Sequence, residues 1–180
     1  AKNSILYIFS DSPRLGDEER VKKVRDFIHT ISGFKKVHIV ERETNNRMLN
    51  SRNGILQLLE RYGRCIFLEE DVVTSRCFLS YMNHCLLTYK DNKEILSISG
   101  YSPNIQIDPS YPYKNHFIPR FNGWGFATWA DRFDPFMTGF TIKQLVKLWK
   151  TKRQFVNSNI GKDFWPMALQ EAVNKTDALD

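Results

Sequence analysis

The stretch that decides the fold is Arg-Cys-Ile-Phe-Leu-Glu-Glu-Asp, residues 64–71. Its first five residues have the composition of a buried strand, and its last three, Glu69, Glu70 and Asp71, are all acids. Like charges repel and burial disfavours ionisation, so three carboxylates at the end of a buried strand are energetically costly. Mn²⁺ or Mg²⁺ would offset that cost, because such ions take few carboxylates and keep positions for phosphate oxygens. Alternatively, one acid points inward and the others begin the next helix, whose positive end favours acids.

Strands and helices alternate along the first hundred residues of the chain. Near-continuous apolar runs predict strands at residues 4–10, 36–41, 64–68 and 95–99. Apolar residues spaced three and four apart predict helices at residues 18–31, 51–62 and 75–89. Helical connections of this length imply parallel strands and a sheet covered on both faces. The order therefore predicts an α/β fold whose first strand is buried on both sides.

Acidic side chains follow two of these predicted strands. Asp11 comes directly after the first strand, and the acidic triplet follows the third. Ligands of parallel sheets bind beyond the carboxyl ends of the strands, so we expect both acidic points on one rim. The chain has neither a dinucleotide-binding glycine fingerprint nor a Walker A loop. A phosphate ligand would therefore need a metal ion or basic side chains to hold it.

Beyond Gly100 the chain changes in character. Residues 101–119 are rich in Tyr, Pro, Asn and Asp, which predicts a long loop of the kind that is usually functional. Residues 123–129 read Gly-Trp-Gly-Phe-Ala-Thr-Trp, and aromatic rings beside glycines offer a flat surface to sugars or bases. The alternative is that Trp124 and Trp129 fill the core at the edge of the sheet. Two further helices are predicted at residues 142–152 and about 163–173.

The composition is that of one globular domain over residues 1–180. Hydrophobic residues make up 42% and charged residues 26%, which are ordinary values. No apolar stretch approaches the roughly 20 residues that a membrane helix needs. The net charge of +6 suits phosphate-bearing ligands, acidic membranes or nucleic acid without distinguishing among them. Three cysteines, Cys65, Cys77 and Cys85, form no CxxC pair and predict buried, reduced thiols in a cytoplasmic protein.

Six segments, taken together and in order, resemble a known enzyme family. They are Ile8-Phe9-Ser10-Asp11, Glu41-Arg42 with Asn45, Leu68-Glu69-Glu70-Asp71-Val72-Val73-Thr74-Ser75, Phe78-Leu79 with Tyr81-Met82-Asn83, Ser97-Ile98-Ser99-Gly100-Tyr101, and Trp124-Gly125-Phe126-Ala127-Thr128-Trp129-Ala130-Asp131-Arg132. They look like those of the bacterial family 2-type glycosyltransferases and, more distantly, of the N-acetylglucosaminyltransferase I group. The resemblance covers nearly the whole chain. It implies a GT-A fold, which is a Rossmann-like, mostly parallel sheet flanked by helices. The implied activity is metal-dependent, inverting transfer of a sugar from a nucleotide sugar, UDP-linked, to a hydroxyl acceptor.

The resemblance also implies roles for individual residues. Asp71 would bind the metal ion that holds the donor diphosphate, and Glu69 and Glu70 would contact hydroxyl groups or metal-bound water. Asp11 would accept the imide N–H of uracil. The donor-sugar and acceptor side would be shaped by Trp124, Gly125 and Trp129.

An inverting transfer also needs a carboxylate that removes the acceptor proton as general base. Asp177 matches a family Asp that Ser-Trp usually follows, but this chain continues with Ala-Leu-Asp. Asp163 is the alternative, and a residue outside the chain is a third.

The resemblance predicts a partial catalytic domain, shortened at both ends. The chain begins at what looks like the family's second strand and stops before its C-terminal acceptor region. Residues 1–100 would form the nucleotide-binding half, and residues 101–180 the donor-sugar and acceptor half. A missing central strand would leave an open edge in the sheet. We expect either weakened donor binding or pairing of that edge with another copy of the chain.

Other functions stay open from the sequence. A nucleotidyltransferase also places acids at strand ends to hold Mg²⁺, and a non-catalytic fragment that binds nucleotide sugars would have the same pattern. The acceptor is a saccharide, a lipid-linked sugar or a protein, and dispersed basic residues argue against nucleic acid. Basic and apolar residues between 143 and 153 suit either an ordinary solvated helix face or peripheral contact with the inner face of a membrane.

Overall fold

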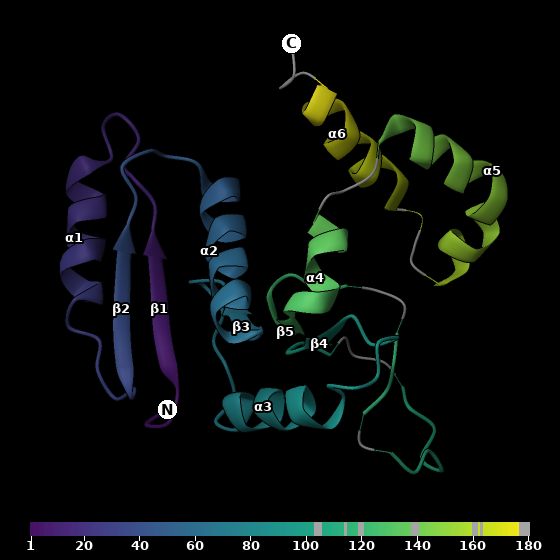
Figure 1. The fold of residues 1–180 in the computed structure, drawn as a ribbon, viewed down its shortest axis with the longest axis horizontal. Helices are drawn as coiled ribbons and strands as arrows, with labels where there is room; N and C mark the ends of the chain where they lie inside the picture. Colours follow the sequence, from purple (N-terminus) through teal and green to yellow (C-terminus); the bar gives the residue numbers. More distant parts are fainter. Residues whose placement is uncertain are drawn as a thin grey trace.

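The computed structural model describes residues 1–102, 106–113, 115–118, 121–137, 141–159, 162 and 164–176. The protein is a mixed α/β chain with two small sheets (Figure 1). The strands are β1 (Ile5–Ser10), β2 (Lys36–Glu41), β3 (Arg64–Leu68), β4 (Ser97–Ser99) and β5 (Gly125–Trp129). The helices are α1 (Glu18–Ile28), α2 (Arg47–Tyr62), α3 (Phe78–Thr88), α4 (Ala130–Met137), α5 (Ile142–Asn159) and α6 (Phe164–Thr176). No helix among these residues is both long and apolar enough to cross a membrane.

Two separate hydrogen-bonded sheets replace the single parallel sheet that the sequence predicts. β1 and β2 pair in parallel, with Ile5 opposite Lys36 and Ser10 opposite Glu41. The second sheet has the order β3-β5-β4, and β5 is antiparallel to both neighbours. β3 and β4 therefore run in the same direction, as their helical connection predicts, but β5 lies between them.

β5 is the element that sequence analysis missed. Its five residues contain two aromatic side chains and a glycine, and they pair with partners about sixty positions earlier, such as Phe67 opposite Phe126. Short strands with distant partners carry weak local signals, because packing rather than propensity decides them. α4, which follows β5 directly, was also not predicted.

The core lies on both faces of the second sheet. Side chains alternate along β5, so Phe126 packs with α2 and α4 while Ala127 and Trp129 pack with α3. The α3 side holds Phe78, Met82, Cys85, Leu86, Ile95, Ile98, Ala127 and Trp129. The α2 side holds Ile55, Leu59, Cys65, Phe126 and Phe133. Both layers are thus attached to one central strand.

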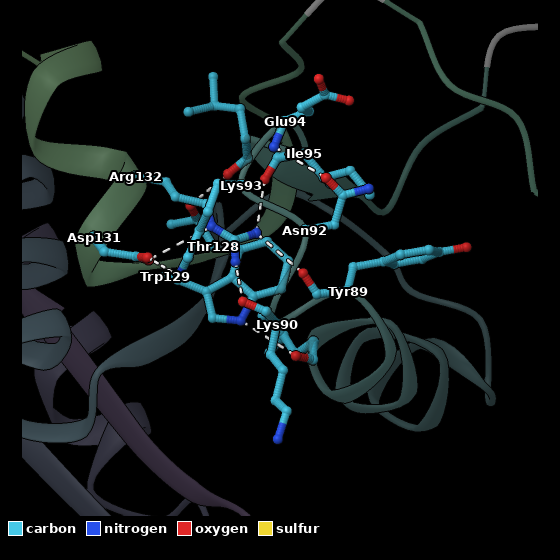
Figure 2. Close-up of polar contacts among 12 residues, drawn as sticks. Tyr89, Lys90, Asn92, Lys93, Glu94, Ile95, Thr128, Trp129, Asp131 and Arg132 are labelled. Carbon is cyan, nitrogen blue, oxygen red and sulfur yellow. Dashed lines mark hydrogen bonds and ion pairs between the residues drawn. The ribbon is translucent and has the colours of Figure 1, made fainter.

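Buried Arg132, in the first turn of α4, joins that helix to the segment between α3 and β4 (Figure 2). Its guanidinium donates to the carbonyl oxygens of Tyr89 at 3.2 Å, Ile95 at 2.8 Å and Lys90. The guanidinium carbon lies 3.8 Å from the centre of the Trp129 ring, and the indole N–H donates to the Leu86 carbonyl. Several carbonyl groups that end a helix and begin a strand are thereby satisfied by one cation.

The first sheet is more open than predicted. Every residue of β1 keeps part of its surface exposed, and Ile5 is 41% exposed. The expectation that this strand is buried on both faces is therefore wrong. The physical reason is that β1 hydrogen-bonds to β2 alone among the described strands, so one of its edges has no ladder partner.

The ends of α2 explain how the chain passes from one sheet to the other. Asn46 caps the helix, because its side chain accepts a hydrogen bond from the Leu49 N–H at 3.0 Å. Gly63 ends the helix with a φ of 71°, in the left-handed region that favours glycine. The chain then enters β3 directly at Arg64.

The cysteines agree with the predicted reduced state but not fully with the predicted burial. All three are free thiols, and Cys65 and Cys85 are buried. Cys77, which precedes α3, is exposed, so the expectation of burial is wrong at that position. Its place at the helix N-terminus, outside the apolar face of α3, accounts for the difference.

Candidate functional site

A pocket of about 350 Å³ opens beyond the carboxyl end of β3. Three segments far apart in the sequence form its walls: the acidic turn and the residues after it, the end of β4, and the start of β5. The lining residues are Leu68, Glu69, Asp71, Val72, Val73, Thr74, Ser75, Phe78, Gly100, Tyr101, Trp124 and Gly125. Each of these segments belongs to a motif that sequence analysis singled out, and the fold brings them together.

The acidic turn supplies two carboxylates to the pocket. After Leu68 ends β3, the chain turns through a hydrogen bond from the Val72 N–H to the Glu69 carbonyl at 3.4 Å. Glu69 and Asp71 line the pocket, whereas Glu70 is exposed and does not. Within the described part of the chain, none of the three carboxylates has a hydrogen-bond or ion-pair partner. The pocket therefore carries uncompensated negative charge on one wall.

Two glycines let the walls approach closely. A Cβ atom at Gly100 would lie 2.6 Å from the Phe78 ring and 2.8 Å from the Met82 methyl group. The Gly100 N–H donates to the Gly125 carbonyl at 2.8 Å, which ties the end of β4 to the start of β5. Any side chain at Gly100 would push these elements apart and change the shape of the pocket.

Two aromatic residues, Tyr101 and Trp124, also line the pocket. Trp124 is 57% exposed, and its ring meets the Tyr101 ring edge-on with centroids 5.1 Å apart. Tyr101 is held by Ser99, whose hydroxyl accepts from its N–H and donates to its carbonyl. Exposed rings that are fixed in place suit the apolar face of a sugar or a base. The alternative that Trp124 fills the core does not agree with its exposure.

Trp129 lies in the core rather than in the pocket. It is 6% exposed, packs in the α3 layer, and donates its indole N–H to the Leu86 carbonyl. Trp129 does not line the pocket, so its position agrees with the core alternative, and its expected role on the donor-sugar side stays a prediction. Trp124 lines the pocket, and what it binds also stays a prediction.

Asp11 serves a different part of the fold from the pocket. Its carboxylate accepts hydrogen bonds at 3.1 Å from the backbone N–H groups of Ser12 and Asn46. It thereby connects the end of β1 to the start of α2, and it does not line the pocket. Arg25 donates to its carbonyl at 3.1 Å. The expected role in base recognition stays a prediction, and one carboxylate oxygen already has local partners.

Residues proposed for the general base lie outside the described part of the chain. Asp163 and Asp177 are both in this category, so their roles stay predictions. Among the described residues, no three His, Cys, Asp or Glu side chains converge into a complete metal site. Two carboxylates on one wall fit a hard cation that shares its coordination with ligand phosphates, rather than a cation held by protein alone.

Several pocket residues had no functional assignment from the sequence. Tyr101, Thr74, Ser75 and Phe78 all line the pocket. Tyr101 follows a strand-ending glycine, and an exposed aromatic residue in that position is the signal that was available. The Ser75 hydroxyl and the Cys77 thiol form a hydrogen bond of 3.3 Å, which places the thiol close to the pocket wall.

Comparison with known proteins adds no assignment to this geometry. Searches of protein families, of curated proteins and of solved structures found no match to the chain.

Proposed function

We propose that this chain is the catalytic core of a metal-dependent, inverting glycosyltransferase with a GT-A fold. It transfers a sugar from a nucleotide sugar, UDP-linked, to a hydroxyl acceptor in polysaccharide or glycoconjugate synthesis. One observation carries the proposal: a single pocket joins the carboxylates of Glu69 and Asp71 to the exposed ring of Trp124. Carboxylates suit the cation of a diphosphate, and a ring suits the sugar attached to it.

The arrangement supports the proposal in a second way. The resemblance rests on separate segments, and three of them, around Asp71, Gly100 and Trp124, meet at this pocket. Segments that resemble a family by chance have no reason to converge. The parallel pair β1–β2 and the helix-connected strands β3 and β4, which run in one direction, agree with a Rossmann-like arrangement.

Each wall of the pocket has its own chemical task under this proposal. Asp71, with Glu69 beside it, would hold Mn²⁺ or Mg²⁺. When bound, that ion neutralises the negative charge of the departing diphosphate. Trp124 and Tyr101 orient the sugar by contact with its apolar face. Gly100 and Gly125 keep the backbone close, so that the sugar rather than a side chain fills the pocket.

The general base remains a prediction that rests on the resemblance. Asp177 is the first candidate and Asp163 the second. A carboxylate in this role accepts the proton of the acceptor hydroxyl as the oxygen attacks the anomeric carbon. Direct displacement of this kind inverts the anomeric configuration.

The test is to identify the product that the chain releases. Incubation with Mn²⁺, a panel of UDP-sugars and a saccharide acceptor should release UDP, and Asp71→Asn should abolish that release. Asp91→Asn is the matched control, because the Asp91 side chain is 89% exposed and its cation Lys90 is 3.9 Å away. Pyrophosphate release from a nucleoside triphosphate and a sugar phosphate would instead identify a nucleotidyltransferase. Nucleotide-sugar binding that Asp71→Asn leaves unchanged would contradict the proposed metal site and favour a non-catalytic module.

A further inference from the structure

A basic, amphipathic surface lies on α5 and α6, on the opposite side of the molecule from β1 and β2 (Figure 1). α5 carries five cations, and it contains no acid. They are Lys143, Lys147, Lys150, Lys152 and Arg153. A helix that only needs solubility usually mixes both signs of charge. An excess of one sign along 18 residues indicates a partner of the opposite sign.

Apolar side chains form a stripe directly beside the lysines. Ile142, Val146 and Trp149 repeat at spacings of four and three, so they share one face of α5. Their exposed fractions are 43%, 48% and 41%. Lys143, Lys147 and Lys150 repeat with the same spacing one position later, and therefore run alongside the stripe. We call these six residues the α5 face.

The α5 face continues into an apolar groove of about 260 Å³ between the two helices. The groove is lined by Leu145, Val146, Trp149, Trp165, Pro166 and Leu169. Leu169, on α6, is 50% exposed, so the apolar surface extends from α5 onto α6. Apolar surface of this kind, bordered by cations, typically marks an interaction site.

The groove is built into the fold rather than left by loose packing. Buried Leu145, Ala168 and Ala172 hold α5 against α6. Trp165 donates its indole N–H to the Asn157 side chain at 2.8 Å, and its ring meets the Trp149 ring edge-on at 4.7 Å. The Arg153 guanidinium lies 4.2 Å from the centre of the Trp149 ring, so a cation accompanies the aromatic residue at the surface.

We propose that the α5 face binds the surface of an anionic phospholipid bilayer. The row of lysines and the apolar stripe of the α5 face match the two layers of such a surface. Lysines attract acidic headgroups, and a tryptophan with aliphatic neighbours enters the boundary between headgroups and acyl chains. The helix then lies in the plane of the interface, as its separate polar and apolar stripes require. This inference uses none of the residues of the candidate pocket, so it stands or falls independently of the proposed transferase activity.

Vesicle sedimentation tests the proposal. The chain should sediment with vesicles that contain phosphatidylglycerol and stay in solution with vesicles of phosphatidylcholine alone. Replacement of Lys143, Lys147 and Lys150 by Gln should weaken binding about a hundredfold, since each cation near an anionic surface contributes about a fivefold factor. Binding should also fall steeply as salt is added. Circular dichroism would verify that each variant remains folded.

A matched variant separates the α5 face from general electrostatic attraction. Replacement of the exposed Lys22, Lys23 and Lys35 by Gln removes the same charge elsewhere and should leave binding within about threefold. Val146→Ser should weaken binding about tenfold, because the apolar stripe loses the contact of the valine side chain with the bilayer. Equal losses in the two lysine variants would overturn the proposal, as would no effect of Val146→Ser or no sedimentation with either vesicle. So would analytical ultracentrifugation that finds a dimer of the chain which the Val146→Ser variant dissociates, because a second copy would then cover the α5 face.

Discussion

Replacement of Arg132 by Met should destabilise the fold by about 4 kcal/mol. The guanidinium makes three hydrogen bonds to carbonyl oxygens, and a bond from a charged donor contributes roughly 1.5–3 kcal/mol. Its contact with the Trp129 ring adds about 1 kcal/mol. The gross loss is therefore about 6 kcal/mol or more. Methionine fills much of the space and removes a buried charge, which returns several kcal/mol.

The Nε atom of Arg132 shows that burial of the guanidinium also has a free-energy cost. This atom is buried without a hydrogen bond, and it lies 3.5 Å from the Asp131 carboxylate. Part of the desolvation cost of the cation is therefore not recovered in the folded state. This is why the net loss is set below the sum of the individual contacts.

Urea unfolding followed by circular dichroism measures the loss, and about 4 kcal/mol corresponds to a fall in Tm of roughly 8–16 °C. Arg132→Lys should lose more than half as much, because one ammonium group cannot reach three carbonyls. Arg20→Met is the control, since its side chain is 86% exposed, and it should change stability by less than about 0.5 kcal/mol. Equal stability of Arg132→Met and the unsubstituted chain would refute the assigned role.

Three further outcomes are expected. Trp124→Ala should leave the free energy of unfolding nearly unchanged and weaken nucleotide-sugar binding, because Trp124 is exposed. Trp129→Ala should lower the free energy of unfolding by about 3–5 kcal/mol, because Trp129 is buried. The reverse order of stabilities in urea unfolding would contradict the two placements. Ellman's reagent should modify exposed Cys77 rapidly in the native chain and Cys65 only after denaturation, because burial raises the pKa of the Cys65 thiol to about 12. A hydrogen bond from Lys93 holds the pKa of Asp131 below its usual value, so this ion pair stabilises the fold above about pH 4 and the stabilisation is lost as the pH falls. In urea unfolding at several pH values, Asp131→Asn should therefore lose less stability in acid than the unsubstituted chain. An unchanged pH profile would count against the ion pair.

Much of the fold was predictable because its elements carry local signals. β2 and β3 begin and end where apolar runs predict, and α2 ends at Tyr62, the last residue of the predicted helix. The helices differ mainly at their ends: α2 begins four residues earlier than residue 51, because the Asn46 side chain caps it. Capping bonds decide such boundaries, and hydrophobic periodicity does not report them.

What could not be predicted depends on contacts between distant residues. The antiparallel strand β5 exists because its residues fit between β3 and β4, and nothing local marks Gly125 as the start of a strand. The separation of β1–β2 from the second sheet likewise follows from pairing rather than propensity.

The candidate site shows the same division between local and distant information. Glu69, Glu70, Asp71 and Trp124 were named as candidates from the sequence, and all of them except Glu70 line one pocket. Trp129, five residues after Trp124, lies within β5 and packs against α3 in the core, whereas Trp124 precedes the strand and stays exposed. Tyr101 was missed because its role depends on facing Trp124.

The central claim is that the pocket beside Asp71 binds a nucleotide diphosphate through a divalent cation. Calorimetric titration of UDP into the chain, with and without Mn²⁺, tests it most directly. The account predicts binding that requires Mn²⁺, that disappears in Asp71→Asn and that persists in Asp91→Asn. Binding of equal strength without Mn²⁺, or in Asp71→Asn, would contradict it.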